Sequence, residues 1–195
     1  MADTESHDIS SSSEAPAPET ASRRWFVLRD LTRPLAKLPA YKRLGDAGFE
    51  VFTPLRESVS AIGGKRIRRE VPVIHDLLFV RSSRRELDPV IEAVDTLQYR
   101  YVKGGAYCEA MTVRDDDMNR FLRAVRSVEY PEYYSPDEIS ADMLGKEVRI
   151  IGGTLDGYSG RLLSRRGSRK KRLLVSLPGL LTAGVEVEPD YIQFV

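Results

Sequence analysis

The sequence predicts an α+β domain, with an antiparallel sheet and flanking helices, followed by a small β-barrel. Strand-like and helix-like segments follow one another from residue 23 to 128 in the order strand, helix, strand, strand, helix, strand, helix. From residue 143 to 195, short β-rich runs are separated by glycine and proline, and no helical period appears. Between them, residues 129–142 hold two prolines and five acids without periodicity, which is typical of a linker.

Proline and glycine punctuate the first half of the N-terminal domain. Aromatic and β-branched residues over 23–30 predict a strand. Spaced apolar residues over 31–48 predict a helix that two prolines delay and two glycines end. Residues 49–82 predict a strand, a basic hairpin tip at Gly63–Gly64, and a return strand.

Helical spacing is clearest in the second half of this domain. Residues 83–97 fit a short helix and residues 98–105 a strand. Over 114–130 the apolar side chains recur at helical positions: Met118, Phe121, Leu122 and Val125. Three acids, Asp115–Asp117, begin this helix, where negative charge favours the helix dipole. That position explains the three acids without a metal ion.

Charge is unevenly distributed along the chain. Residues 1–22 hold five of the 29 acids and no Lys or Arg, which leaves a net charge of +6 on residues 23–195. These first residues have almost no large apolar side chain, so we expect a disordered acidic tail rather than a signal peptide. A single cysteine, Cys108, excludes an internal disulfide and a multi-cysteine metal site. We expect a cytoplasmic, monomeric protein without a membrane span, metal or cofactor.

A glycine-rich stretch, VRIIGGTLDGYSGRLL, raises two alternatives. A phosphate-binding loop needs a helix after the glycines, because the helix N-terminus supplies the N–H donors. The residues after Gly160 show no helical stripe and no Gly-Lys-Ser/Thr ending. We therefore interpret the stretch as a tight turn between two strands, in which glycines supply positive φ angles.

Two parts of the chain resemble one known family. The stretch GKEVRIIGGTLDGYSGRLL resembles the KOW motif through Gly153, Leu155, Gly157 and Gly160, and VEVEPDYIQFV resembles the closing strand of such a barrel. The first part of the chain resembles the N-terminal domain of NusG-type transcription elongation factors. The resemblance is carried by the stretch RWFVLR, the predicted helix after it, and the stretch EVPVIHDLLFVRSS. The chain looks like a specialised paralog, similar to RfaH-like factors and to UpxY-type antiterminators of capsular polysaccharide loci. Residues 74–77, Ile-His-Asp-Leu, stand where the housekeeping factor has Phe-Pro-Gly-Tyr.

This resemblance implies a non-enzymatic factor that binds the β′ clamp helices of RNA polymerase and suppresses pausing or termination. By motif position, the polymerase surface would include Ile74, Leu77 and Phe79, with Arg29 at its margin. Strand alternation makes both faces of this segment apolar, so one face is either a partner site or is buried as well. In housekeeping relatives the barrel binds Rho or a ribosomal protein, and SLPGLLTAG departs from the usual loop here.

Basic residues form the candidate nucleic-acid surface. Phosphates attract Lys and Arg whatever the base sequence, so the exposed non-template DNA strand is one candidate ligand and nascent RNA another. The candidates in the N-terminal domain are Arg33, Lys37, Lys42, Arg43, Lys65, Arg66, Arg68 and Arg69. Residues 161–172 add a basic hairpin on the barrel. Solvated surface charge explains both sets equally well.

The remaining candidates for chemistry have ordinary structural explanations. Trp25 and Phe26 could stack a base, but an aromatic pair in a first strand usually belongs to the core. His75 and Asp76 lack a nucleophile and a third partner, so they fit a polar pair in a turn. No catalytic constellation is apparent. The competing interpretation is a ribosome-associated or RNA-binding KOW protein, whose barrel would bind structured RNA with steep salt dependence.

Overall fold

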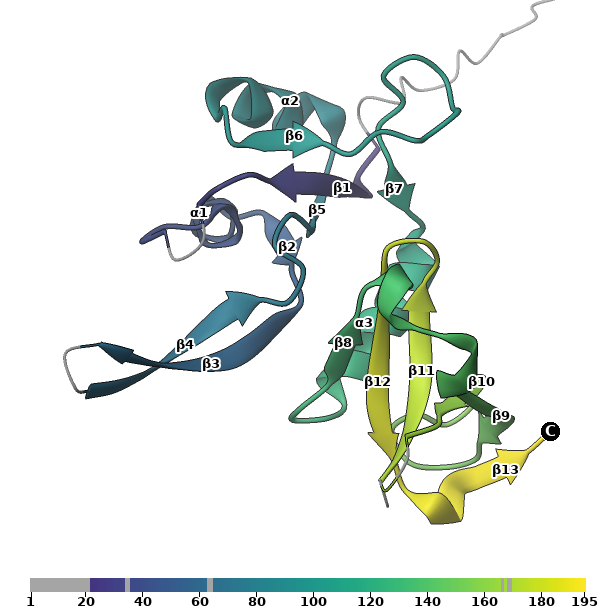
Figure 1. The fold of residues 1–195 in the computed structure, drawn as a ribbon. Coiled ribbons are helices and arrows are strands. Elements are labelled where there is room, and N and C mark those ends of the chain that lie inside the picture. Colours follow the sequence, from purple (N-terminus) through teal and green to yellow (C-terminus); the bar gives the residue numbers. More distant parts are fainter. Residues whose placement is uncertain (1–21, 34–35, 63–64, 166, 168–169) are drawn as a thin grey trace, which may run out of the picture.

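The computed structural model describes residues 22–33, 36–62, 65–165, 167 and 170–195 (Figure 1). The expected acidic tail lies outside these residues apart from Ser22, as does the expected hairpin tip at Gly63–Gly64. The described residues form an N-terminal unit of sheet and helices and a C-terminal unit made almost entirely of strands. The predicted α+β fold class is confirmed.

A central antiparallel sheet organises the N-terminal unit. β1 pairs with β5 on one side and with β6 and β7 on the other, and β2 extends the sheet beyond β5. The strands are β1 (Arg24–Asp30), β2 (Glu50–Phe52), β5 (Leu78–Ser82), β6 (Leu97–Tyr99) and β7 (Thr112–Val113). A separate hairpin of β3 (Leu55–Ile62) and β4 (Lys65–Pro72) projects from this sheet (Figure 1).

Both faces of the central sheet are apolar, and helices cover both. Phe26 and Leu28 of β1 face one way and join a core with α1 (Ala40–Asp46) and α2 (Arg84–Ala93). Trp25 and Val27 alternate to the other face and join a second core with α3 (Asp115–Arg126). Helix α1 begins only at Ala40, after the two prolines, as their positions predicted.

Helix α3 lies between the two units. Its acids Asp115–Asp117 form the first turn and its apolar residues are buried, as the spacing predicted. Phe121 belongs to a hydrophobic cluster that also contains Val148 and Leu173 of the C-terminal unit. In Figure 1, α3 lies behind β11 and β12, and these elements are in contact. The two units therefore share one continuous core.

The C-terminal unit is a six-stranded antiparallel sheet with strand order β13-β9-β10-β11-β12-β8. Its inward residues, among them Val148, Leu173 and Val185, form the core of the unit. The strands are β8 (Glu132–Tyr134), β9 (Leu144–Ile150), β10 (Ser159–Leu163), β11 (Lys171–Leu177), β12 (Leu181–Val187) and β13 (Ile192–Phe194). This strand-rich unit agrees with the expected KOW-type domain.

The segment 129–142, predicted as a linker, contains a strand and a turn. It contains β8, which pairs with β12 through Tyr134 and Thr182, and a 3-10 turn at Pro136–Glu138. The carboxylate of Glu132 forms an ion pair with the guanidinium of Arg172, at 3.0 Å. Two β-favouring tyrosines and this ion pair attach part of the predicted linker to the barrel edge.

The glycine-rich stretch forms a turn between β9 and β10. Gly152, Gly153 and Gly157 have φ angles of 101°, 68° and 80°, and a strand rather than a helix follows. The N–H of Gly157 donates to the carbonyl of Ile150 at 2.9 Å and closes the turn. A β-carbon at Gly160 would lie 2.9 Å from the carbonyl oxygen of Leu174. The predicted tight turn is confirmed, and the helix that a phosphate loop requires does not follow it.

No helix within the described residues is both long and apolar enough to cross a membrane.

Candidate nucleic-acid interface

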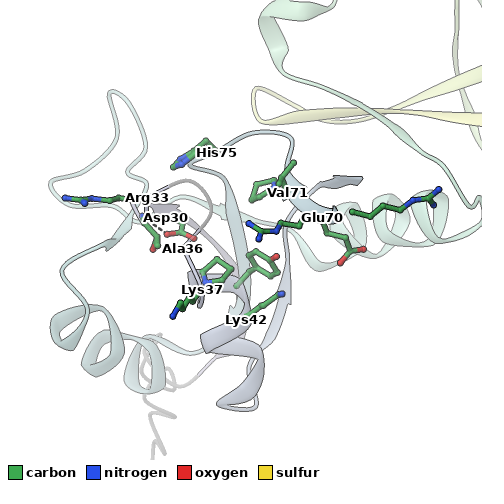
Figure 2. Close-up of a pocket in the computed structure, with 14 residues that line it drawn as sticks. Asp30, Arg33, Ala36, Lys37, Lys42, Glu70, Val71 and His75 are labelled. Atoms are coloured by element: carbon green, nitrogen blue, oxygen red, sulfur yellow. Dashed lines mark hydrogen bonds between the residues drawn. The ribbon is translucent and has the colours of Figure 1, made fainter. Parts of the chain in front are cut away.

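A basic cleft lies between the segment after β1 and strand β4. Its volume is about 610 Å³, and Figure 2 shows side chains from both segments around it. The cationic lining residues are Arg33, Lys37, Lys42, Arg68 and Arg69, and His75 also lines the cleft. Two acids, Asp30 and Glu70, also line this basic cleft, together with the apolar groups of Tyr41, Pro39 and Pro72. The cleft thus combines excess positive charge with surfaces against which a flat ring can pack.

Asp30 fixes the segment that carries two of these cations. It is the last residue of β1 and is buried. Its Oδ1 accepts a hydrogen bond from the N–H of Thr32 at 2.9 Å, and its Oδ2 accepts one from the N–H of Ala40 at 3.2 Å. One carboxylate therefore holds the chain on both sides of Arg33 and Lys37, and it also satisfies a donor at the start of α1.

Helix α1 presents Tyr41 and Lys42 to the basic cleft. The Lys42 Nζ lies 5.9 Å from the centre of the Tyr41 ring. Burial raises the pKa of Tyr41 above its usual value, and the nearby carboxylates of Glu70 and Asp30 raise it further. The tyrosine hydroxyl consequently remains protonated at neutral pH and can donate a hydrogen bond.

Strand β4 supplies the opposite wall. Arg69 pairs across the hairpin with Ser58, and Arg68 pairs with Val59 and lies 3.9 Å from the carboxylate of Glu57. Within the described part of the chain, no carboxylate lies within 4 Å of the cationic nitrogens of Lys37, Lys42 or Arg69. These three charges are available to an external anion.

The structure brings together five of the eight basic residues that the sequence suggested. Arg33, Lys37 and Lys42 meet Arg68 and Arg69 across the basic cleft. The other three lie outside the cleft lining: Arg43 on α1, and Lys65 and Arg66 nearer the tip of the β3–β4 hairpin.

The apolar side chains expected at a polymerase surface are not exposed. Leu77 and Phe79 are 2% and 0% exposed. The Phe79 ring lies 5.9 Å from that of Phe52, which lies 5.9 Å from the ring of Phe121 on α3. Leu77 and Phe79 are buried in the core that the central sheet shares with α3 and the C-terminal unit, so neither side chain is exposed in this structure. Their contact with the polymerase stays a prediction.

Near the end of β1, the sheet carries polar side chains beside the buried cluster. Ile74 is half-buried against the shared core and Arg29 is exposed. The carboxylate of Asp76 accepts hydrogen bonds from Arg29 Nε and Arg100 Nη2, each at 3.3 Å. The predicted margin residue Arg29 therefore lies in an accessible charged group that joins β1, the turn before β5, and the segment after β6.

The other candidates have structural roles. Trp25 and Phe26 are buried core residues. Asp117 pairs with Arg114 at 2.8 Å and Asp115 with Arg81 at 3.3 Å. In the barrel hairpin, positions 166, 168 and 169 lie outside the described residues, and three of its described cations form ion pairs: Arg165 and Arg172 with Glu132, and Lys170 with Glu186.

Sequence reasoning did not assign four titratable residues of the basic cleft to a ligand site: Asp30, Tyr41, Glu70 and His75. An Asp directly after a strand and before Thr-Arg-Pro is a turn signal, so the role of Asp30 in shaping the segment was accessible from sequence. No sequence pattern indicated Glu70 or His75, because their place in the cleft depends on how the β3–β4 hairpin lies against the segment after β1.

Fold and cleft together define an α+β protein with a strand-rich C-terminal unit and a surface suited to a polyanion. A sequence profile of the family described as "Transcription termination factor nusG" matches residues 23–122, just over half of the chain. The chain belongs to this NusG family, whose members are non-enzymatic transcription factors that typically interact with RNA polymerase.

Further comparisons were made with curated proteins and solved structures. No curated protein matches the chain. A structure titled "Domain interaction in Thermotoga maritima NusG" aligns over 89% of this chain and 98% of that one, with a TM-score of 0.43 and 15% sequence identity.

Proposed function

We propose that this protein is an antitermination factor that binds the β′ clamp helices of RNA polymerase and suppresses pausing or termination at specific operons. Exopolysaccharide or capsule loci are the proposed targets, by resemblance to UpxY-type and RfaH-like factors. Membership of the NusG family supports a role in elongation. The Ile-His-Asp-Leu turn at 74–77, in place of the housekeeping Phe-Pro-Gly-Tyr, supports a specialised role.

The basic cleft is the observation that carries this proposal. Lys37 and Lys42 on one side and Arg69 on the other, which lie more than 4 Å from every carboxylate of the described residues, line the same cleft as Tyr41. A single strand offers both phosphates for the cations and unstacked bases for the ring, whereas a duplex keeps its bases stacked inside. The non-template strand of a transcription bubble has these properties, so it is the proposed ligand.

The proposed polymerase surface is the uncovered end of the central sheet. It consists of Ile74 and Arg29, with the Asp76 carboxylate between Arg29 and Arg100. Leu77 and Phe79 belong to the buried cluster against which Ile74 packs, and they would support this surface rather than contact the partner. An apolar centre with a charged rim is typical of a protein interface.

Strand binding tests the basic cleft. The double variant Lys42→Gln/Arg69→Gln removes two cleft cations, and Arg43→Gln/Arg66→Gln removes two cations from the same helix and strand outside the cleft. Binding of a labelled single-stranded DNA is measured by fluorescence anisotropy over a range of salt concentrations. The cleft variant should lower the slope of log K against log salt by about 1.4, since each phosphate contact to a single strand contributes about 0.7. Equal losses in the two variants would contradict the assignment.

Capture of core RNA polymerase by the full chain tests the other surface. Ile74→Asp places a charge at the apolar centre and should abolish capture, while Ile151→Asp, an exposed apolar position on the C-terminal unit, should not. Capture by the Ile74→Asp variant at the wild-type level would refute this surface. Binding of structured RNA without any polymerase capture would instead favour a ribosome- or RNA-binding KOW protein.

A further inference from the structure

A second pocket lies at the seam between α3 and the C-terminal unit, away from the basic cleft. Its volume is about 490 Å³. Helix α3 and the residue after it supply most of its polar groups, and the glycine-rich turn supplies Thr154. The lining residues of this seam pocket are Glu50, Asn119, Leu122, Arg123, Arg126, Ser127 and Thr154.

Contacts beside the seam pocket hold its two walls together. The guanidinium of Arg120 lies 4.9 Å from the centre of the Tyr158 ring, and its Nη2 donates to the carbonyl of Ser159 at 3.2 Å. In return, the Tyr158 hydroxyl donates to the carbonyl of Arg120 at 2.9 Å. Tyr158 is buried at this contact. The arginines of α3 and the glycine-rich turn are thus positioned against each other before any ligand binds.

The charges in the seam pocket are unbalanced. Within the described residues, no carboxylate lies within 4 Å of the guanidinium nitrogens of Arg123 or Arg126. The one acid in the lining, Glu50, already forms an ion pair with Arg81 at 3.5 Å. Two uncompensated guanidiniums therefore share a pocket with the side-chain amide of Asn119 and the hydroxyl of Thr154, both of which can donate hydrogen bonds.

This combination matches the chemistry of a phosphate group. Guanidinium groups bind phosphate oxygens through paired N–H donors, and amides and hydroxyls supply further donors to the same oxygens. Arg123 and Arg126 are three residues apart on α3, which places their β-carbons about 5–6 Å from each other. A cation in the last helical turn is explained by the helix dipole alone, but the dipole does not explain a polar pocket shared with another unit.

A run of cations along the seam favours a polymer over a single anion. A second depression, lined by Arg114, Arg120 and Arg161, adjoins the Arg120–Tyr158 contact. Asp117 in that depression is already paired with Arg114. We propose that the seam pocket binds a backbone phosphate of a second stretch of single-stranded nucleic acid, independently of the basic cleft. The chain would then contact two strand segments at once.

Stoichiometry distinguishes this site from the basic cleft. The full chain is titrated at low salt with six-nucleotide oligo-dT and, separately, six-nucleotide oligo-U, and bound molecules are counted by native mass spectrometry. Wild type should bind two oligonucleotides and Arg123→Gln/Arg126→Gln one. Lys42→Gln/Arg69→Gln should retain the seam-bound molecule. Comparison of the two oligonucleotides shows whether a DNA or an RNA strand occupies the seam.

Matched variants separate binding from folding. Arg85→Gln, an exposed arginine on α2, should leave the stoichiometry unchanged. Arg123→Lys/Arg126→Lys keeps the charges favourable to the helix end but removes the paired N–H donors, so it should fold like wild type and bind the second oligonucleotide more weakly. Asn119→Asp adds a negative charge to the pocket without removing a cation, and it should lose the same molecule even if the glutamine variant folds poorly. An unchanged stoichiometry in folded Arg123→Gln/Arg126→Gln, or in Asn119→Asp, would overturn the proposal.

Discussion

At the residue scale, Glu86 shows how one carboxylate joins separate parts of the N-terminal unit. Its Oε1 accepts from Arg23 Nη2 at 2.9 Å, and its Oε2 accepts from the Ser82 hydroxyl at 3.1 Å and from the Ser83 N–H at 3.4 Å. The Ser83 hydroxyl in turn accepts from the Glu86 N–H, which completes a capping box at the start of α2. The hydrogen bond from Arg23, followed by those from Ser83 and Ser82, lowers the pKa of Glu86 to about 2.

This lowered pKa predicts a pH-dependent stability. Because the folded state binds the Glu86 proton more weakly than the unfolded state, the stabilisation is complete above a pH of about 4.5 and is lost as pH falls toward about 2. Glu86→Gln should therefore lower the thermal unfolding midpoint at pH 7, with the difference from wild type shrinking over that interval. Glu92→Gln, on the same helix, is the control. A pH-independent difference for Glu86→Gln would contradict the assignment.

At the element scale, the turn between β9 and β10 depends on backbone conformations that only glycine adopts easily. Gly157 has a φ of 80°, and no atom lies within 4 Å of the place where its β-carbon would stand. Gly152 and Gly153 also have positive φ, and β-carbons on them would approach the Tyr191 ring to between 3.0 and 3.2 Å. A substitution at Gly157 therefore changes the backbone preference of the turn without creating a steric clash.

Substitutions at Gly157 should follow tolerance of the left-handed region rather than side-chain size. Gly157→Asn should cost little, whereas Gly157→Val should cost about 1–2 kcal/mol, because a β-branched residue is strained at positive φ. Urea denaturation of the full chain measures both. Equal destabilisation by Asn and Val would show that the turn relaxes to another conformation.

At the scale of the whole molecule, the shared core couples the two units. Phe52 of the N-terminal unit lies 5.9 Å from Phe121 of α3 and 6.4 Å from Tyr133 of β8, ring centre to ring centre. Trp25, the single tryptophan, is buried in the same cluster as Leu177 of β11. The two units should consequently unfold together.

A cavity in the C-terminal unit tests this coupling. Leu177→Ala removes a buried side chain and should cost about 2–5 kcal/mol. Trp25 fluorescence reports the N-terminal unit, and far-UV circular dichroism reports the whole chain. Both should show one transition in urea, shifted by the same amount. A Trp25 transition that keeps its wild-type midpoint would demonstrate independent units.

Local patterns predicted the elements well, and their tertiary arrangement poorly. The spacing of Phe121 and Leu122 and the prolines before Ala40 predicted helices, since these signals act within a few residues. Alternation showed that Phe79 lay on an apolar face, but whether α3 or a partner covers that face is decided by the three-dimensional path of the chain. Five of the eight basic residues that the sequence suggested line the basic cleft, and their nucleic-acid role stays a prediction. Which of them line the cleft depended on the position of the β3–β4 hairpin, which no local pattern gives.

The pairing of β8 with β12 has a consequence for solubility. An uncovered strand edge presents a row of unpaired N–H and C=O groups to which other chains can add, and β8 covers part of that edge at Ala183 and Gly184. A fragment that begins at residue 143, where composition places the domain boundary, would leave this part of the edge open and promote aggregation. A fragment that begins at Pro131 retains the strand that covers it.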